Sequence, residues 1–123
     1  MLNNICIIDR ASGRLMLERK SDNIIVDADL FSSLISAIHS FTTAIQMGEL
    51  TSFTTHSKKI LLSVTDYLII VLIMDSSDSS EKWLGTAYEI AHEFESQFEL
   101  ANWNGNRSTF SGFERKLNAI LNA

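Results

Sequence analysis

The chain has 123 residues and a mass of 13.8 kDa, enough to bury one hydrophobic core and too little for two ordinary domains. Hydrophobic residues make up 46% and charged residues 20%, a composition that excludes a disordered chain. The net charge of −5 repels phosphate backbones, so we expect no nucleic-acid binding. The sequence therefore predicts one folded domain over residues 1–123.

The location of the protein is predicted from its cysteine and its apolar segments. Cys6 is the single cysteine, so the chain can form no internal disulfide and suits a reducing compartment. The first residues lack the basic and long apolar regions of a secretory signal. The longest apolar run, residues 67–74, is far shorter than the roughly 20 residues that cross a bilayer as a helix. We expect a cytoplasmic protein that does not insert into membranes.

The first two elements are expected to form a hairpin. Residues 4–9 contain a β-branched run and are followed by a turn in which Gly13 can supply a positive φ. Residues 14–19 alternate less cleanly, and a polar stretch separates them from the apolar residues 24–26. This second strand is predicted to lie at an edge of a sheet.

The segment from Leu30 to Ile45 carries the clearest helical pattern. Asp27 is placed to cap this helix and Gly48 to end it. We expect its apolar face to pack on a sheet, because burying one large apolar side chain contributes roughly 1.5–3 kcal/mol. The residues of this face recur at steps of three and four: Leu30, Leu34, Ala37, Ile38, Phe41 and Ile45.

Three strands are predicted next, over residues 50–56, 58–65 and 67–75, with the first two joined as a hairpin. The last of them is apolar from Leu68 to Ile73 without alternation, so both of its faces must be covered. Two further helices supply the second cover. One follows Asp78 and Glu81, which have the spacing of a capping box, and the other spans about residues 109–122.

This order of elements resembles the longin domain, a five-stranded antiparallel sheet with one helix on one face and two on the other, in the order β-β-α-β-β-β-α-α. The phrases that carry the resemblance are Ile7 to Gly13, Asp29 to Phe41, Leu68 to Asp75, and Trp103 to Gly105. They are similar to small stand-alone longin proteins of the longin/roadblock superfamily. The related roadblock domain opens with a helix, whereas this chain opens with a strand, which favours longin.

The resemblance implies a function in protein interaction. Longin and roadblock domains are binding platforms in membrane trafficking and regulators of small GTPases, often paired as dimers. By that likeness we expect a homodimer, or a heterodimer with a related longin/roadblock domain, that engages a small GTPase or a trafficking partner.

The residues predicted to form the partner surface lie opposite the expected core face of the first helix, which Leu34 and Ile38 define. From Leu30 to Met47 no side chain is charged, and cores of interfaces are depleted of charge. A plain solvated face of serines and threonines is the alternative. The predicted surface consists of Ser32, Ser36, His39, Ser40, Thr43 and Met47, with Phe31 and Ile35 at its margin.

A second predicted surface is the third strand, where Thr51, Phe53 and Thr55 alternate with polar neighbours. If this strand is an edge, its open backbone groups can pair with a partner.

No catalytic, cofactor or metal site is predicted. The sequence contains no phosphate-binding loop, nucleophile elbow, HExxH or CxxC motif. His39, His56 and His92 lie in different elements, without the spacing of metal ligands. The alternative function is a small-molecule sensor of the PAS type, which would need an internal pocket with converging polar groups.

Overall fold

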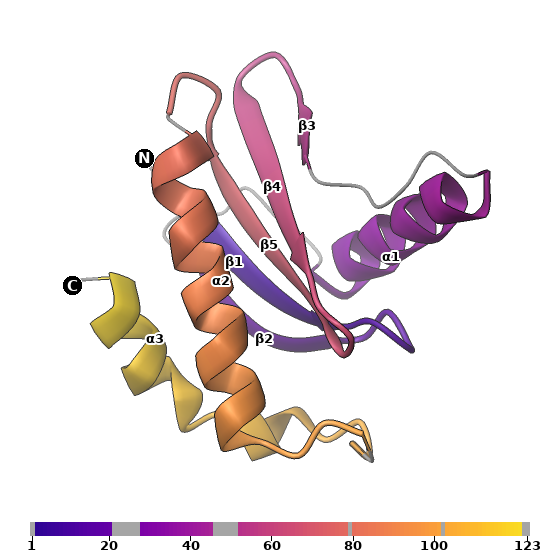
Figure 1. Cartoon of the computed structure of the whole chain (residues 1–123), viewed down its shortest axis with the longest axis vertical. Helices are drawn as coiled ribbons and strands as arrows, with labels where there is room; N and C mark the ends of the chain where they lie inside the picture. The colour runs from indigo at the N-terminus through magenta and orange to yellow at the C-terminus, as the bar shows by residue number, and fades with distance from the viewer. Residues whose placement is uncertain (1, 21–27, 46–51, 79, 102, 122–123) are drawn as a thin grey trace.

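The computed structural model describes residues 2–20, 28–45, 52–78, 80–101 and 103–121. Its elements follow one another along the chain as shown in Figure 1. They are β1 (Leu2–Asp9), β2 (Leu15–Lys20), α1 (Ala28–Ala44), β3 (Ser52–Thr54), β4 (Lys58–Val64), β5 (Leu68–Asp75), α2 (Ser80–Gln97), the 3-10 helix η1 (Arg107–Phe110) and α3 (Phe113–Leu121). The predicted α/β class is confirmed. The predicted caps Asp27 and Gly48 and the apolar residues 24–26 lie outside the described residues.

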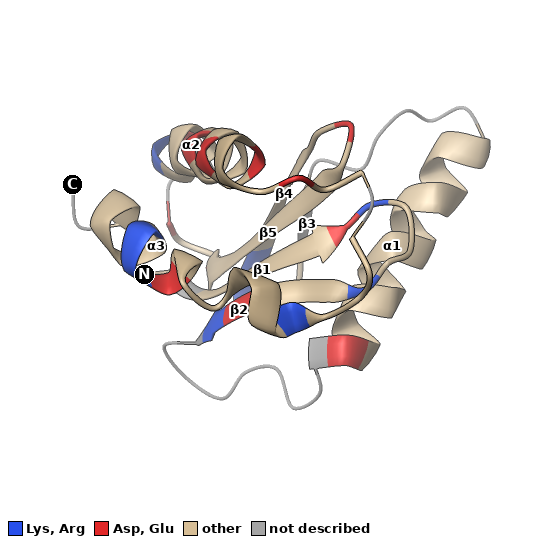
Figure 2. Cartoon of the chain, turned by 90° about the horizontal axis from the view of Figure 1, so that it is seen from below, with Lys and Arg blue, Asp and Glu red and all other residues tan. Residues whose placement is uncertain are grey.

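The strands form one antiparallel sheet in the order β2-β1-β5-β4-β3. β5 lies at its centre and is buried from Leu68 to Met74. Its side chains alternate between the two faces of the sheet, so a run without polar residues is stable only if both faces are covered. Figure 2 shows these covers, with α1 on one face and α2 and α3 on the other.

Two separate hydrophobic clusters fill the spaces between the sheet and the helices. On the α2 and α3 face, Ile7 and Ile70 pack with Ile90 and Phe94 of α2. On the α1 face the cluster is smaller, and among the described residues α1 contributes one fully buried hydrophobic side chain to it, Ile35. The larger share of the core therefore lies under α2 and α3.

The turn between β1 and β2 is held by Asp9. The Asp9 Oδ2 atom accepts hydrogen bonds from the backbone N–H of Ser12 at 3.2 Å and from its hydroxyl at 2.5 Å. Gly13 takes a φ of +74°, which a residue with a side chain rarely adopts. Arg10 connects this turn to the turn between β4 and β5, because its Nη1 donates a hydrogen bond to the carbonyl oxygen of Thr65 at 2.7 Å.

The predicted last helix over residues 109–122 is divided in the structure. The segment begins as η1, whose N-cap Asn106 accepts a hydrogen bond from the backbone N–H of Ser108, and α3 starts only at Phe113. The interruption places Phe110 and Phe113 in the same core as Phe94. The ring centroid of each lies 5.0 Å from the ring centroid of Phe94. The aromatic contacts therefore bridge the break between the two short helices.

The ends of β4 and β5 are joined by an ion pair that makes a pH-dependent prediction. Lys58 Nζ donates to Asp75 Oδ1 at 2.8 Å, and this hydrogen bond lowers the pKa of Asp75 below its ordinary value of 3.8. The contribution of this ion pair to stability is therefore fully present above about pH 3.8. It is lost as the pH falls through the lowered pKa of Asp75 in the folded state. We expect Lys58→Met to raise the pKa of Asp75, measured by carboxyl ¹³C NMR titration. An unchanged titration curve would contradict the pairing.

Candidate interaction surface

The orientation of α1 is opposite to the one predicted from its apolar pattern. Ile35 and Ser32 are fully buried against the sheet and His39 is nearly so, whereas Leu34 is 55% exposed and Phe41 is 62% exposed. α1 contacts β1 and β2 through this buried face. The prediction that the face of Leu34 and Ile38 packs on the sheet is therefore wrong.

Small side chains explain why this face of α1 can lie on the sheet. At Gly13 there is no room for a side chain, because a Cβ atom would lie 2.9 Å from the Oγ of Ser36. The helix is therefore in close contact with the β1–β2 turn, and Ser32 and Ser36 permit that approach. Ile35 fills the remaining space in the cluster that contains Cys6 and Ile8.

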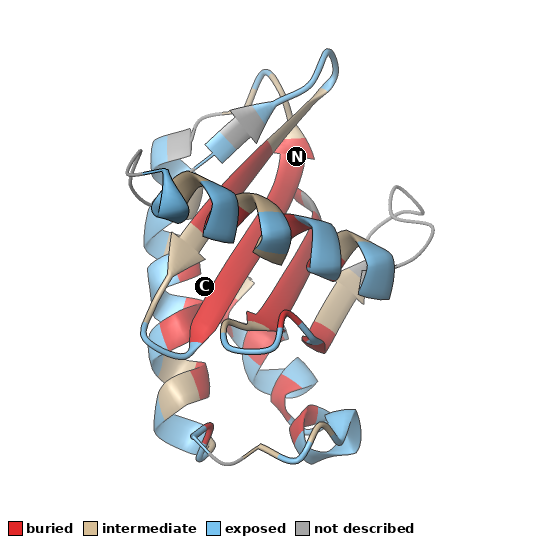
Figure 3. Ribbon diagram, turned by 90° about the vertical axis from the view of Figure 1, so that its right-hand side faces the viewer, coloured by how far each residue is buried: buried red, intermediate tan, exposed pale blue. Residues whose placement is uncertain are grey.

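The outer face of α1 is consequently apolar and exposed, and we call it the α1 outer stripe. Its four large hydrophobic residues are Leu30, Leu34, Phe41 and Ile45. Figure 3 shows α1 crossing in front of the buried strands with exposed residues along its outer side. Asp29 is the single charged residue of α1, so no charge interrupts the stripe (Figure 2). Large exposed apolar patches mark sites that bind another surface.

The residues predicted for the partner surface are divided by this orientation. Three of them are buried and cannot contact a partner, namely Ser32, Ile35 and His39. Phe31 and Ser36 are partly buried, and Ser40, Thr43 and Thr55 are exposed. Met47 and Thr51 lie outside the described residues, and of Phe53 only the backbone is described. Ser40 and Thr43 line an open hollow with Arg10 and His39, and Thr55 follows β3 directly.

Sequence reasoning missed the α1 outer stripe because periodicity identifies an apolar face without identifying what covers it. The available signal was the absence of charge on both sides of the helix. A helix with one side in water usually carries charged residues there. The uncharged run therefore led to the expectation of a cover on both sides of α1, without telling which side the sheet covers.

β3 is an edge strand, because it pairs only with β4 and ends the sheet. It is three residues long, from Ser52 to Thr54, and so is shorter than the predicted strand over residues 50–56. Thr55 closes the hairpin by accepting, through its Oγ1, a hydrogen bond from the backbone N–H of Lys58 at 3.2 Å. Among the described residues, no strand pairs with the other side of the β3 backbone.

Among the described residues, no group of three or more histidine, cysteine, aspartate or glutamate side chains is arranged to hold a metal ion. Over the same ranges, no helix is long and apolar enough to cross a membrane. Four hollows on the surface of the described residues are open to solvent.

No protein-family model matches the sequence, and no curated protein matches it. Solved structures do match. MglB of Myxococcus xanthus superposes with a TM-score of 0.58 at 18% identity, over 77% of this chain and 85% of that one. An MglB with tetrameric arrangement gives a TM-score of 0.62 at 13% identity, over 78% of this chain and 76% of that one. The roadblock/LC7 domain from Streptomyces avermitilis gives a TM-score of 0.59 at 14% identity, over 77% of this chain and 81% of that one.

The chain has the longin/roadblock fold. The predicted resemblance to this superfamily is therefore confirmed at the level of the fold. The matched structures named above carry roadblock or MglB names, so they do not support the preference for longin over roadblock. Identities below 20% show the common fold alone, and the chain covers more than three quarters of each of these structures.

Proposed function

We propose that this longin/roadblock chain is a non-enzymatic interaction module that forms a pair through the α1 outer stripe. The partner in the pair is a second copy or a related longin/roadblock domain. The observation that carries the proposal is the exposure of Leu30, Leu34, Phe41 and Ile45 on a helix with one charged residue. Each large side chain gains roughly 1.5–3 kcal/mol when it is fully buried, so covering this stripe is favourable.

The edge strand β3 supports the same pairing. Its unpaired backbone groups can bond to the β3 strand of a second chain, which would extend the sheet across the pair. Isologous pairing joins the same surface of two copies. Because β3 is short, it adds few hydrogen bonds to such a pair, and the α1 outer stripe supplies most of the association energy. Thr55, beside this edge, remains in the proposed surface, as do the exposed Ser40 and Thr43 of α1.

The partner of the pair is proposed from the fold. MglB and roadblock domains are interaction modules associated with small GTPases, and one matched MglB has a tetrameric arrangement. We therefore propose that the pair engages a small GTPase or a trafficking partner in the cytoplasm. A PAS-type sensor is not favoured, because the matched structures are MglB and roadblock domains and the described core has aliphatic side chains on both faces of β5.

Light scattering of two variants tests the pairing. Leu34→Glu places a charge in the α1 outer stripe and should halve the apparent mass, because a buried unpaired charge opposes association. Ser33→Glu adds the same charge to an exposed position of the same helix outside the stripe and should leave the mass unchanged. An unchanged mass for Leu34→Glu, or a natural chain that stays monomeric at high concentration, would contradict pairing.

The GTPase arm needs a separate measurement. A small GTPase that binds the folded chain should raise its melting temperature, since a ligand of the folded state stabilises it by an amount that grows with the logarithm of its concentration over Kd. Metabolites should give no such rise. A shift with metabolites and none with GTPases would favour the sensor.

A further inference from the structure

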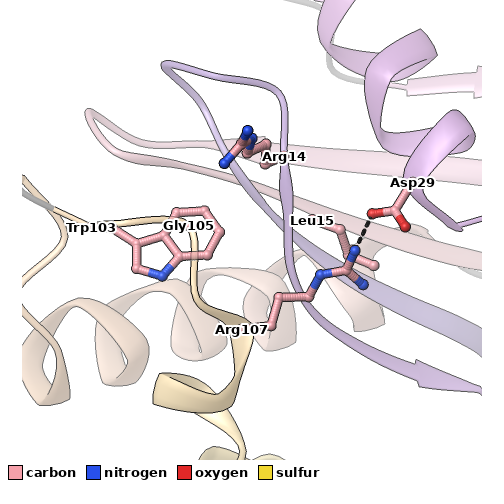
Figure 4. A pocket seen from close by; sticks show the side chains of 6 residues that line it. All are labelled: Arg14, Leu15, Asp29, Trp103, Gly105 and Arg107. Atoms are coloured by element: carbon pink, nitrogen blue, oxygen red, sulfur yellow. Dashed lines mark hydrogen bonds and ion pairs between the residues drawn. The ribbon is translucent and has the colours of Figure 1, made fainter.

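A pocket of about 190 Å³ lies where three distant segments of the chain meet. Figure 4 shows its walls, with Arg14 from the β1–β2 turn, Leu15 from the start of β2, Asp29 from the first turn of α1, and Trp103, Gly105 and Arg107 from the segment before α3. Two arginines and one aspartate give the walls a net charge of +1, whereas the whole chain has a net charge of −5. The pocket is therefore a local positive site on an acidic protein.

The two arginines differ in what they contact. Arg107 Nη2 donates to Asp29 Oδ1 at 2.5 Å, and both side chains are more than half exposed. The guanidinium of Arg14, in contrast, makes no hydrogen bond or ion pair with the part of the chain that the structure describes. It lies against Gly105, where a Cβ atom would come within 2.5 Å of its Nη1. Gly105 also has a φ of +88°, so the lack of a side chain at this position both permits the turn and leaves room for Arg14.

The aromatic wall of the pocket is fixed in place. Trp103 Nε1 donates to the carbonyl oxygen of Asn106 at 3.0 Å, and its ring centroid lies 5.3 Å from that of the buried Phe110. The loop is further held by Asn104, whose Oδ1 accepts from the backbone N–H of Asn106 at 2.9 Å. A ligand would thus meet a rigid indole and a guanidinium without an anionic partner.

We propose that this pocket binds a carboxylate carried by a protein partner, with Arg14 as its principal contact and Asp29 as an internal competitor. A guanidinium presents a planar fork of donors that matches a carboxylate. The structure holds one such pair already, since Asp29 is a carboxylate bound to Arg107. The volume admits the head of an acidic side chain, and the chain's negative charge opposes a free polyanion. The inference deepens the proposed interaction function by naming the chemistry of a partner segment.

NMR of the two indole N–H groups tests the site, because Trp83 on α2 serves as a reference within the same molecule. The probes are an acetylated hexaglutamate peptide, sodium acetate and inorganic phosphate, each added at constant ionic strength. We expect the peptide to shift the Trp103 signal in a saturable way while Trp83 stays in place. Equal shifts of both signals, no shift of Trp103, or tighter binding of acetate or phosphate than of the peptide would overturn the proposal.

Three variants locate the contact. Arg14→Gln should weaken peptide binding roughly fivefold or more, since it removes a charge-assisted pair. Asp29→Asn should tighten it about tenfold, because Arg107 is released and the wall charge rises from +1 to +2. Arg115→Gln, at an exposed position of α3, should change nothing. Weakened binding by Asp29→Asn, or an Arg14→Gln variant that binds like the natural chain, would overturn it.

The result is separable from the test of pairing. Arg14→Gln should retain the apparent mass of the natural chain, and Leu34→Glu should retain the Trp103 shift with the peptide. Loss of the shift in the Leu34→Glu variant would overturn the assignment to a pocket within one chain.

Discussion

Phe94→Ala is expected to lower the free energy of unfolding by about 3–5 kcal/mol, because it removes a large side chain from a closely packed cluster. Phe94 is fully buried on α2, and its ring centroid lies 5.0 Å from those of Phe98, Phe110 and Phe113. The loss is large against the 5–15 kcal/mol that is typical of whole domains. It should also loosen η1 and α3, whose buried aromatic residues both contact this ring.

Urea unfolding followed by circular dichroism measures the change. Tyr88→Ala is the matched control, since Tyr88 is an aromatic residue of the same helix but is 72% exposed. Its substitution should alter the free energy of unfolding by no more than about 0.5 kcal/mol. Similar losses for the two variants would mean that α2 does not present this face to the core.

A comparison of Ile35→Ala with Leu34→Ala tests the orientation of α1 most directly, because the two residues are adjacent and both aliphatic. Ile35 is fully buried and its truncation should lower the free energy of unfolding by about 2–5 kcal/mol, through lost contacts and a cavity. Leu34 is 55% exposed, so its truncation should cost the monomer less than about 1 kcal/mol.

The free energy of unfolding of both variants is measured first at low protein concentration, where pairing contributes little. A second series at high concentration separates the roles, because a residue of the pairing surface gains importance as association becomes favourable. Leu34→Ala should then become more destabilising relative to the natural chain. A larger loss for Leu34→Ala than for Ile35→Ala at low concentration would restore the orientation predicted from the apolar pattern.

Much of the fold was accessible from local patterns. The unbroken apolar run of β5 demanded a cover on each face, since side chains alternate across a sheet and neither set could face water. Gly13 marked the first turn, where it takes a positive φ. The break between η1 and α3 was missed, because Phe110 and Phe113 fit a helical spacing even though aromatic contacts with α2 hold them on separate helices.

The candidate site was less accessible. The absence of charge on α1 suggested a cover on two sides, and the prediction of a partner surface followed from that alone. Which side of α1 lies on the sheet depends on Ser36 lying against Gly13, a contact between residues that are far apart in the sequence. The pocket of Arg14 and Arg107 is equally non-local, since its walls come from three segments separated by long stretches of chain.

The sequence by itself determined the α/β class, a central strand covered on both faces, and a first helix poor in charge. Only the tertiary structure decided that Ile35 enters the core and that Leu34 and Phe41 do not. The physical reason is that periodicity reports how residues are distributed around one helix axis. The rotation of that helix on the sheet is set by the shapes of the two surfaces, here by how closely small side chains let α1 approach the β1–β2 turn.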